Sequence, residues 1–507
     1  MKFMLILVLV SVIAVNAQTQ QGISSISQEN LMKTVNFLAS KELAGRLSGS
    51  EGYNKAARYM AAEFSKLGLK PLGDSAYCQN LKVEYNEIHP PLKLWLMEDG
   101  RRLPAVLSTR GVADDSSGRL KEYKLGKDFV CRELTGSGHV TAPLVFCGYG
   151  LSMPEFGYDD YAGINVKGKI VIVFKPNPSW KMNDTSNWGS GYPRFKARLA
   201  KEHGAVGMLI VSTPNDPKPQ KTIISVLEGG GEQDEQFPQM HIDIPVADEL
   251  LFGSSYSLKN LQSKIDSLKH PFSIPVTSQV EIEINAKYTK EKPTINIIGL
   301  LEGTDPVLKN EYLVIGAHLD HVGSQANEIY APGANDNASG SAAVLEIARA
   351  FAGGNVKPKR SIIFTLFASE ELGLIGSKYF VDHPPVPLER IAAMFNLDCI
   401  GYGDSIQIGN GKSSPNLWGI AHRQDSLFTK MMVEATWNGG GADAGPFHDK
   451  GIPAAYFVTT NSYAHLHYMT DTPETLNRPL FEKITRLAYL TAYQVAGGMY
   501  NRENVMK

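Results

Sequence analysis

The chain has 507 residues, of which 43 % are hydrophobic and 20 % are charged, and these values are typical of a folded globular protein. It contains 50 lysines and arginines against 52 aspartates and glutamates, so its formal net charge is −2. A chain this close to neutral has no bulk attraction for nucleic acid or anionic lipid, which argues against a nucleic-acid-binding protein. Its 4 cysteines are too few for a disulfide scaffold.

The first 17 residues have the pattern of a secretory signal. Lys2 supplies a positive charge, residues 3–15 are apolar, and Ala17 is the second of two small residues at a cleavage position. The apolar run is short for a membrane span, which needs about 20 residues. The sequence therefore predicts cleavage after Ala17 and an exported mature chain without a membrane span, in the periplasm or outside the cell.

Export makes disulfide bonds feasible, although the sequence leaves their pairing open. Cys399 follows an apolar strand-like run and is expected to be a buried free thiol. The candidates for pairing are Cys78, Cys131 and Cys147.

Residues 25–72 are predicted to be helical, because apolar residues recur there at helical spacing until Gly68 and Pro71 end the pattern. From about residue 90 to 285 the character changes to short β-like runs separated by glycine and proline. These runs include 142–147, 169–174 and 206–211, with one helix-like stretch at 195–203.

The last run of this region, residues 279–288, alternates apolar and polar side chains. This alternation predicts an exposed or edge strand.

From about residue 292 onward, strand-like and helix-like runs alternate. The strand-like runs are almost wholly apolar, which favours a mostly parallel sheet covered by helices on both faces. In such sheets, ligands bind beyond the carboxyl ends of the strands. The predicted strands are 295–301, 312–316, 361–368, 392–397 and 454–458, and the predicted helices are 338–351, 372–381 and 480–495.

Polar residues that bind divalent metals follow these strands. Any one of them has an ordinary structural explanation as a turn, a cap or a solvated charge, but five such groups at successive strand ends are hard to explain that way. The groups are Ala317-His318-Leu319-Asp320-His321, Asn335-Asp336-Asn337, Ser369-Glu370-Glu371, Asn396-Leu397-Asp398 and the loop His465 to Thr472.

Imidazole and carboxylate ligands together suit Zn²⁺ or a similar divalent ion. Two ions about 3.5–4 Å apart need a shared carboxylate, and Asp336, which begins a helix between the other groups, is the natural bridge. Glu370 and Glu371 are neighbours that point in opposite directions in extended chain, so one can bind metal while the other acts as general base. Asp320, two residues after His318, can accept the free ring N–H of that histidine.

These motifs, A-H-x-D, N-D-x-x-S-G, S-E-E-x-G, N-x-D and H-x-x-x-D-T, resemble the di-zinc exopeptidase family of aminopeptidase Y and glutamate carboxypeptidase II. The segment 43–46 is similar to the N-terminal part of that family, and 168–173 with 196–207 is similar to a protease-associated (PA) domain. The resemblance implies an α/β fold: a mostly parallel-sheet, three-layer, zinc-exopeptidase (phosphorylase/hydrolase-like) catalytic domain with an inserted β-rich PA domain. The implied organisation is a signal peptide (1–17), an N-terminal catalytic segment (18–90), the PA-like insert (91–285) and the main catalytic domain (286–507).

The resemblance also implies roles for individual residues around two Zn²⁺ ions, or Co²⁺ or Mn²⁺ in their place. One ion is held by His318, Asp336 and Asp398, and the other by Asp336, Glu371 and His467. Glu370 is then the catalytic base, and Asp320 the partner of His318. His465 competes with His467 for the last position, but only His467 has the family's spacing to Asp471-Thr472.

Two departures from the family pattern leave substrate preference open. In the stretch Ala442 to Phe447 the expected histidine is absent, and Leu466 stands where many aminopeptidases have a tyrosine before the last ligand. The implied activity is that of a metal-dependent exopeptidase acting on peptides, foremost an aminopeptidase. The alternatives are a carboxypeptidase of the same family, a one-zinc glutaminyl cyclase and a non-catalytic binding protein on the same fold. Oligomeric state is left open.

Overall fold

The computed structural model describes residues 22–97, 118–183, 187–226, 229–354 and 357–506. They divide into two compact units, each with its own core. Unit 1 contains the described residues up to 83, then 291–323 and 331 onward, and unit 2 contains those of 84–290 and 324–330. The predicted signal peptide lies outside the described residues. Among the described residues, no helix is both long and apolar enough for a membrane span.

Unit 1 is built on a sheet of six strands in the order β17-β18-β16-β12-β15-β11. The four inner strands are parallel to one another, and the strand at each end is antiparallel to its neighbour. The expected mostly parallel sheet is therefore confirmed. The strands are β11 (Ile274–Leu301), β12 (Tyr312–His318), β15 (Ser361–Phe367), β16 (Ile391–Leu397), β17 (Ile406–Gly409) and β18 (Ala454–Thr459).

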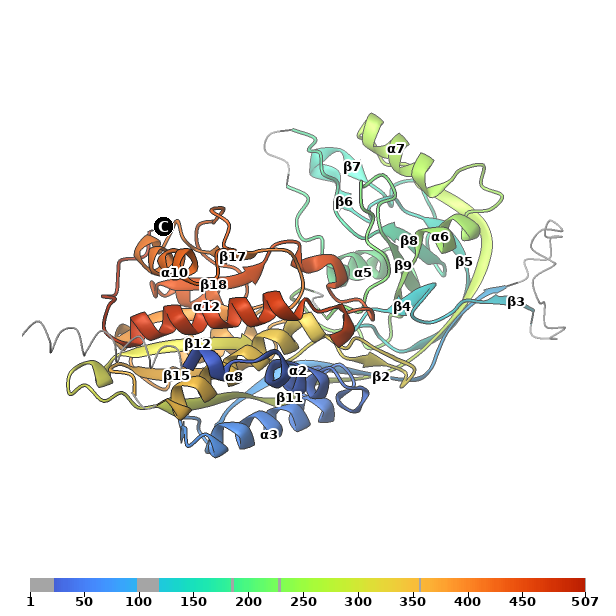
Figure 1. The fold of residues 1–507 in the computed structure, drawn as a ribbon. Coiled ribbons are helices and arrows are strands. Elements are labelled where there is room, and N and C mark those ends of the chain that lie inside the picture. Colours follow the sequence, from blue (N-terminus) through green and yellow to red (C-terminus); the bar gives the residue numbers. More distant parts are fainter. Residues whose placement is uncertain (1–21, 98–117, 184–186, 227–228, 355–356, 507) are drawn as a thin grey trace, which may run out of the picture. The chain divides into compact units, whose positions relative to one another are not determined.

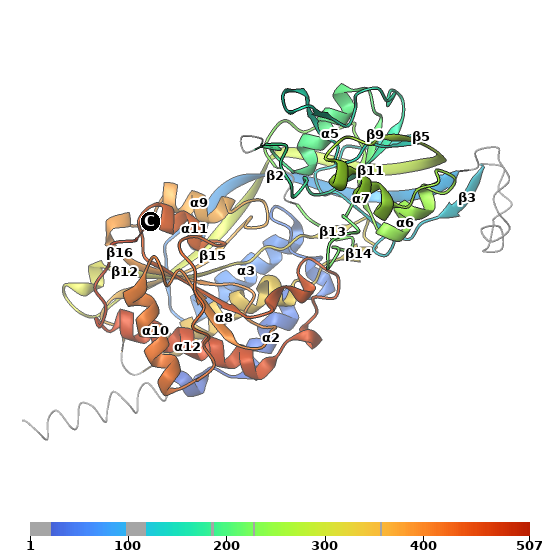
Figure 2. The same cartoon turned by 90° about the horizontal axis from the view of Figure 1, so that it is seen from above.

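Helices cover both faces of this sheet (Figures 1 and 2). One face packs against α2 (Gln28–Leu38), α3 (Glu51–Lys66), α8 (Gly340–Gly353), α10 (Pro415–Leu427) and α12 (Arg478–Ala496). The other packs against α9 (Ile375–Asp382) and α11 (Ala444–Asp449). Along β12, Leu313 and Ile315 join the first core and Val314 the second. This alternation explains why the strands are apolar throughout.

The N-terminal helical region follows its sequence signals. Helix α3 begins after Ser50, whose hydroxyl accepts a hydrogen bond from the Tyr53 N–H at 3.1 Å. It ends before Gly68, whose positive φ of 72° suits glycine. The sequence patterns did not predict β17, α10 or α11, which lie in the glycine-rich stretch after β16.

Unit 2 is also layered, with the strand order β11-β5-β8-β9-β10-β4. Helices α6 and α7 pack on one face of its parallel strands and α5 on the other. The sequence-predicted strands and helix of this region are present as β5, β8, β9 and α5. The elements are β2 (Cys78–Met97), β3 (Arg119–Glu122), β4 (Phe129–Cys131), β5 (Gly138–Phe146), β8 (Ile170–Phe174), β9 (Gly207–Val211), β10 (Gln239–Ile242), α5 (Pro193–Glu202), α6 (Ile244–Leu250) and α7 (Leu258–Leu268).

The prediction of an exposed or edge strand at 279–288 is wrong. This stretch is the middle of β11, which pairs with β5 and also with β2. Val280, Ile282 and Ile284 are buried in the core of unit 2. The alternation reflects a strand with one buried face, and a period-2 pattern does not reveal how many neighbours the strand has.

Short strands complete the two units. Residues 324–330 lie between the first two predicted ligand groups in the sequence but belong to unit 2. Within that unit, the Gln325 side chain donates a hydrogen bond to the Cys131 carbonyl at 2.8 Å and accepts one from the Cys131 N–H at 2.9 Å. None of Cys78, Cys131, Cys147 and Cys399 forms a disulfide bond within the described residues, and Cys399 is buried as expected. The short strands are β1 (Lys70–Pro71), β6 (Ser152–Met153), β7 (Tyr158–Asp159), β13 (Ser324–Gln325) and β14 (Ile329–Tyr330).

Candidate metal centre

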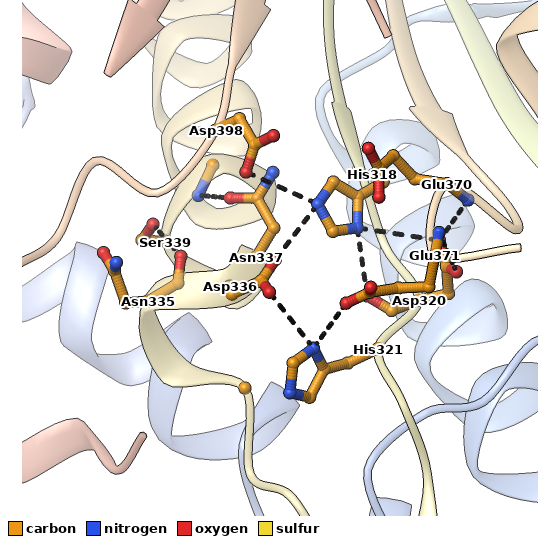
Figure 3. A network of polar contacts seen from close by, with 12 residues as sticks. His318, Asp320, His321, Asn335, Asp336, Asn337, Ser339, Glu370, Glu371 and Asp398 are labelled. Atoms are coloured by element: carbon orange, nitrogen blue, oxygen red, sulfur yellow. Dashed lines mark hydrogen bonds and ion pairs between the residues drawn. The ribbon is translucent and has the colours of Figure 1, made fainter. Parts of the chain in front are cut away.

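The ends of the parallel strands of unit 1 bring four of the five predicted ligands, all but His467, into one buried cluster (Figure 3). His467 is partly exposed. His318 is the last residue of β12, and Asp398 directly follows β16. Glu371 lies in the loop after β15, and His467 in the loop after β18. Asp336 lies in the turn η4 (Ala334–Ser339) that leads into α8. Parallel strands place their carboxyl ends at one edge, so residues up to about 150 positions apart meet there.

The first group of ligands surrounds His318. Its Nε2 lies 3.3 Å from Asp336 Oδ1 and 3.4 Å from Asp398 Oδ1. At zinc–ligand bond lengths of about 2.0–2.1 Å, two ligands of a tetrahedral ion lie about 3.3–3.4 Å apart. Among the described residues, Asp398 Oδ1 is buried without a hydrogen-bond partner, and a cation would satisfy it. The three residues therefore fit one zinc ion.

The second group uses the other oxygen of Asp336. His467 Nε2 lies 3.3 Å from Asp336 Oδ2 and 2.9 Å from Glu371 Oε2. The two oxygens of Asp336 thus face two different histidines, as a carboxylate shared by two ions requires. His465, the competing candidate, has a different partner: its ring Nδ1 lies 2.9 Å from the Thr470 hydroxyl.

The charges in the cluster strongly shift the pKa values of its carboxyl and imidazole groups. Burial alone would raise the pKa of the Asp336 carboxyl, but hydrogen bonds from His318 and His467 hold it well below its usual range. Burial would likewise lower the pKa of His318, but Asp398 and other nearby carboxylates raise it well above normal. Such dense, opposite charges in a buried site are typical of ligand sets for divalent cations.

Asp471, the aspartate of the late motif, holds the turn that carries Asp336. Asp471 accepts hydrogen bonds from the backbone N–H groups of Asn335 at 2.9 Å and Asp336 at 3.0 Å. The Asn335 side chain in turn accepts from the N–H groups of Gly401 and Tyr402. The loop after β16 and the loop after β18 are thereby both tied to the turn that carries Asp336.

Asp320 contacts both His318 and the loop that carries the two glutamates. Its Oδ1 lies 3.7 Å from His318 Nδ1, beyond hydrogen-bond distance, whereas its backbone carbonyl lies 3.2 Å from the same nitrogen. Its carboxylate also accepts hydrogen bonds from the backbone N–H groups of Glu370 at 3.2 Å and Glu371 at 3.4 Å. Asp320 therefore joins the end of β12 to the loop that carries the two glutamates.

Arg46, in the segment resembling the family's N-terminal part, is fully buried beside the cluster. Its guanidinium donates to the carbonyls of Leu319 at 3.0 Å, Pro332 at 2.8 Å and Gly333 at 3.0 Å. Burial lowers its pKa to about 10, while nearby carboxylates such as Asp336 oppose that shift. Arg46 thus connects the His318 loop with the turn leading to Asp336.

One residue of the cluster had no predicted role. His321 Nδ1 lies 2.8 Å from Glu371 Oε1 and 3.6 Å from Asp336 Oδ2 (Figure 3). The only signal in the sequence was its place in the group His318-Leu319-Asp320-His321, which also supplies a ligand.

Comparison with known proteins gives two family matches. Residues 296–492 match the model of peptidase family M28, and residues 140–250 match the PA domain. Aminopeptidase YwaD of Bacillus subtilis is 31 % identical over 189 residues, which are 36 % of this chain and 39 % of that protein. A glutamate carboxypeptidase 2 homolog of Caenorhabditis elegans is 22 % identical over 536 residues, or 89 % of this chain and 65 % of that protein. The chain thus spans between about two fifths and two thirds of the length of these relatives.

Solved structures share the fold over nearly the whole chain. The aminopeptidase from Aneurinibacillus sp. strain AM-1 has a TM-score of 0.64 at 22 % identity, covering 96 % of this chain and 97 % of that one. The peptidase M28 precursor from Shewanella amazonensis has a TM-score of 0.67 at 19 % identity, covering 97 % and 98 %. The expected three-layer fold with an inserted domain is therefore confirmed. Residues 296–492 are thus similar to peptidase family M28, and residues 140–250 to the PA domain.

Proposed function

We propose that this chain is an exported metal-dependent aminopeptidase that binds two zinc ions, or Co²⁺ or Mn²⁺ in their place, and releases N-terminal residues from peptides. The observation that carries the proposal is the position of Asp336, whose two carboxylate oxygens face His318 and His467. Cleavage at the amino end is supported by the likeness to an enzyme named an aminopeptidase. Carboxypeptidase activity is the second candidate, favoured by the likeness to glutamate carboxypeptidase 2 homologs.

When bound, the ions would polarise the scissile carbonyl and lower the pKa of a water molecule. Glu370 would take the proton from the attacking water and deliver it to the leaving amine. Burial raises the pKa of the Glu370 carboxyl well above its usual range, which brings it toward the pH at which a general base is most effective. The Asp320 carboxylate would hold Glu370 in place by accepting a hydrogen bond from the Glu370 backbone N–H.

A set of four matched peptides tests the direction of cleavage. The zinc-loaded protein is incubated with one peptide in free form, with its N-terminus acetylated, with its C-terminus amidated, and with both ends blocked. An aminopeptidase cleaves the free and amidated forms only, and a carboxypeptidase cleaves the free and acetylated forms only. The E370Q variant, prepared in the same way, controls for contaminating peptidases. If the wild-type protein cleaves neither the acetylated nor the amidated peptide, this result contradicts exopeptidase activity.

The number of ions separates the remaining alternatives. Metal analysis of the purified active protein should give two zinc ions per chain, and chelation should abolish activity that zinc then restores. One tightly bound zinc and cyclisation of an N-terminal glutamine would favour a glutaminyl cyclase. Two bound ions without any turnover would favour a binding protein on the same fold.

Export is tested separately from catalysis. The full-length chain is expressed in a host with a secretory pathway, and the N-terminal sequence of the protein in the exported fraction is determined. Cleavage after Ala17 is expected. Retention of the uncleaved chain inside the cell would contradict this part of the proposal.

A further inference from the structure

His321 is a buried histidine in contact with the second group of ligands, and neither the sequence motifs nor the mechanism above uses it. Its side chain is completely buried. Its ring packs against Gly333, where a Cβ atom would lie 2.5 Å from the ring carbon Cδ2 of His321. The absence of a side chain at Gly333 therefore makes room for this ring, so the site is built to hold an imidazole in one orientation.

The two oxygens of Glu371 have different histidine partners. Oε1 lies 2.8 Å from His321 Nδ1, and Oε2 lies 2.9 Å from His467 Nε2. Because Oε2 is the oxygen on the side of His467, it is the one that faces the second ion. The contact between His321 and Oε1 has the length of an N–H···O hydrogen bond to a carboxylate. The nearest oxygen of the bridging Asp336 is 3.6 Å from the same nitrogen, too far for a hydrogen bond.

The position of the proton on the His321 ring determines whether this histidine can be a metal ligand or a hydrogen-bond donor. Among the described residues, His321 Nε2 is buried and has no hydrogen-bond partner. If Nδ1 bound a metal ion, a neutral ring would carry its proton on Nε2, and burying that N–H without an acceptor costs about 1–3 kcal/mol. If Nδ1 carries the proton and donates to Glu371, Nε2 has only a lone pair and no N–H is left unpaired.

We propose that His321 is a positioning residue for the second ion: its Nδ1–H donates to Glu371 Oε1 and leaves Oε2 alone to bind the metal. The hydrogen bond restricts Glu371 to one-oxygen binding and fixes the direction of that oxygen, as partners of metal ligands generally do. This inference rests on the two-ion site proposed above, but it concerns the affinity for one ion only. Of the first group, the contacts above bring only the shared residue Asp336 near the His321 ring, at 3.6 Å and through Oδ2, the oxygen on the side of His467.

Three variants test the proposal by metal affinity. H321A removes the donor, H321N offers an amide N–H near the place of Nδ1, and H465A removes a histidine whose ring contacts Thr470 and Tyr402. Zinc affinity is measured by competition with a chelator, in two steps. In H321A the second ion should bind 10–100-fold more weakly while the first is unaffected. H321N should recover most of that loss, and H465A should match the wild type.

A second measurement reads the proton directly and does not depend on activity. In the zinc-loaded wild-type protein labelled with ¹⁵N-histidine, a ring Nδ1–H resonance should be present and should disappear in H321N. A metal ligand has no proton on the ligating nitrogen, so absence of this resonance would make His321 a ligand and overturn the proposal. Wild-type affinity for the second ion in H321A would overturn it as well.

The two proposals fail in different ways. If the wild-type protein binds only one zinc, the two-ion function fails, whereas the Nδ1–H resonance still decides whether His321 donates to Glu371. Circular dichroism and the affinity for the first ion show whether H321A is folded. If H321A is unfolded, the resonance in the wild-type protein and the second-ion affinity of H321N decide the outcome.

Discussion

Glu370 and Glu371 are adjacent, have the same side chain, and lie in opposite electrostatic environments. Burial alone would raise the pKa of Glu371, but His467 and His321 outweigh it and bring the pKa to about 2. For Glu370 burial is the largest influence, and the neighbouring Glu371 adds to it, so its pKa is raised well above normal. Two carboxyls whose pKa values are pushed apart in one site suit different tasks, one as metal ligand and one as proton carrier.

Substitution of each glutamate by glutamine should separate these tasks. E370Q should keep both zinc ions and the fold but lose about 10²–10⁴-fold in kcat, because it removes the general base. Its KM should change little. E371Q should lose zinc, because a neutral amide is a poor ligand for the ion. Metal analysis and steady-state kinetics of both variants check this. Near-normal turnover of zinc-loaded E370Q would contradict the proposed mechanism at its central residue.

At the scale of elements, the start of α8 packs directly on the end of β16. A Cβ atom on Gly340 would lie 2.1 Å from the Leu397 carbonyl oxygen. The Asn337 side chain donates to that same carbonyl at 2.9 Å and accepts from the Gly340 N–H at 2.8 Å. Since Asp336 precedes this contact and Asp398 follows Leu397, the close approach helps to set the distance between these two proposed ligands.

The variant G340A should therefore push α8 away from β16. We expect a loss of about 1–3 kcal/mol in the free energy of unfolding, together with weaker zinc binding. G353A is the matched control, because it lies at the other end of α8 and its added Cβ would meet nothing within 4 Å. It should be neutral or stabilising by up to about 1 kcal/mol. Denaturant unfolding and zinc titration measure both effects, and equal behaviour of the two variants would contradict this account.

Arg46 connects elements that are far apart in the sequence. R46M should remove the guanidinium donors to the buried carbonyls of Leu319, Pro332 and Gly333, so we expect a loss of stability on the order of 3 kcal/mol. The Gly333 carbonyl keeps one donor, the Ala338 N–H at 3.1 Å. The control R58M removes an exposed arginine that pairs with Glu51, and it should cost about 0–1 kcal/mol. Thermal unfolding of both variants provides the comparison. A loss in R46M no larger than in R58M would show that the buried guanidinium does not hold the loops.

At the scale of the whole molecule, the charges of the metal-free site make stability depend on pH. The pKa of His467 is raised well above normal, because Glu371 and Asp336 outweigh the lowering by burial, and that of His318 is raised as well. A histidine with a raised pKa in the folded state stabilises the protein fully below its unfolded-state pKa of about 6.5. That stabilisation is lost as the pH rises through the raised pKa.

The metal-free protein should therefore unfold at progressively lower temperature as the pH rises above about 6.5. The zinc-loaded protein should show the opposite trend, because zinc binds the neutral imidazoles and competes with their protons. Melting curves across this pH range, with and without zinc, check the prediction. Isothermal titration in buffers of different ionisation enthalpy should also detect proton release on zinc binding. A melting temperature that rises with pH in the metal-free protein would contradict the assignment.

Local sequence patterns were sufficient to predict the alternating strands and helices of unit 1 apart from β17, α10 and α11. Continuous apolar strands can only be buried on both faces, and parallel strands must end at one edge. The meeting of His318, Asp336, Glu371 and Asp398 therefore followed from their positions after such strands. The five-residue group at 317–321 already contained His321, but nothing in its spacing distinguished a ligand from a ligand's partner.

Tertiary structure decided the features that depend on side-chain direction. It placed the Asp320 carboxylate on the N–H groups of Glu370 and Glu371, and the His321 ring on Glu371, across about 50 residues of sequence. It also paired β11 on both sides, which an alternating pattern does not reveal. The sequence by itself determined which chemical groups reach the site, because strand ends position backbones. Only the packed structure determined which oxygen faces which nitrogen, because that depends on rotamers set by contacts between distant residues.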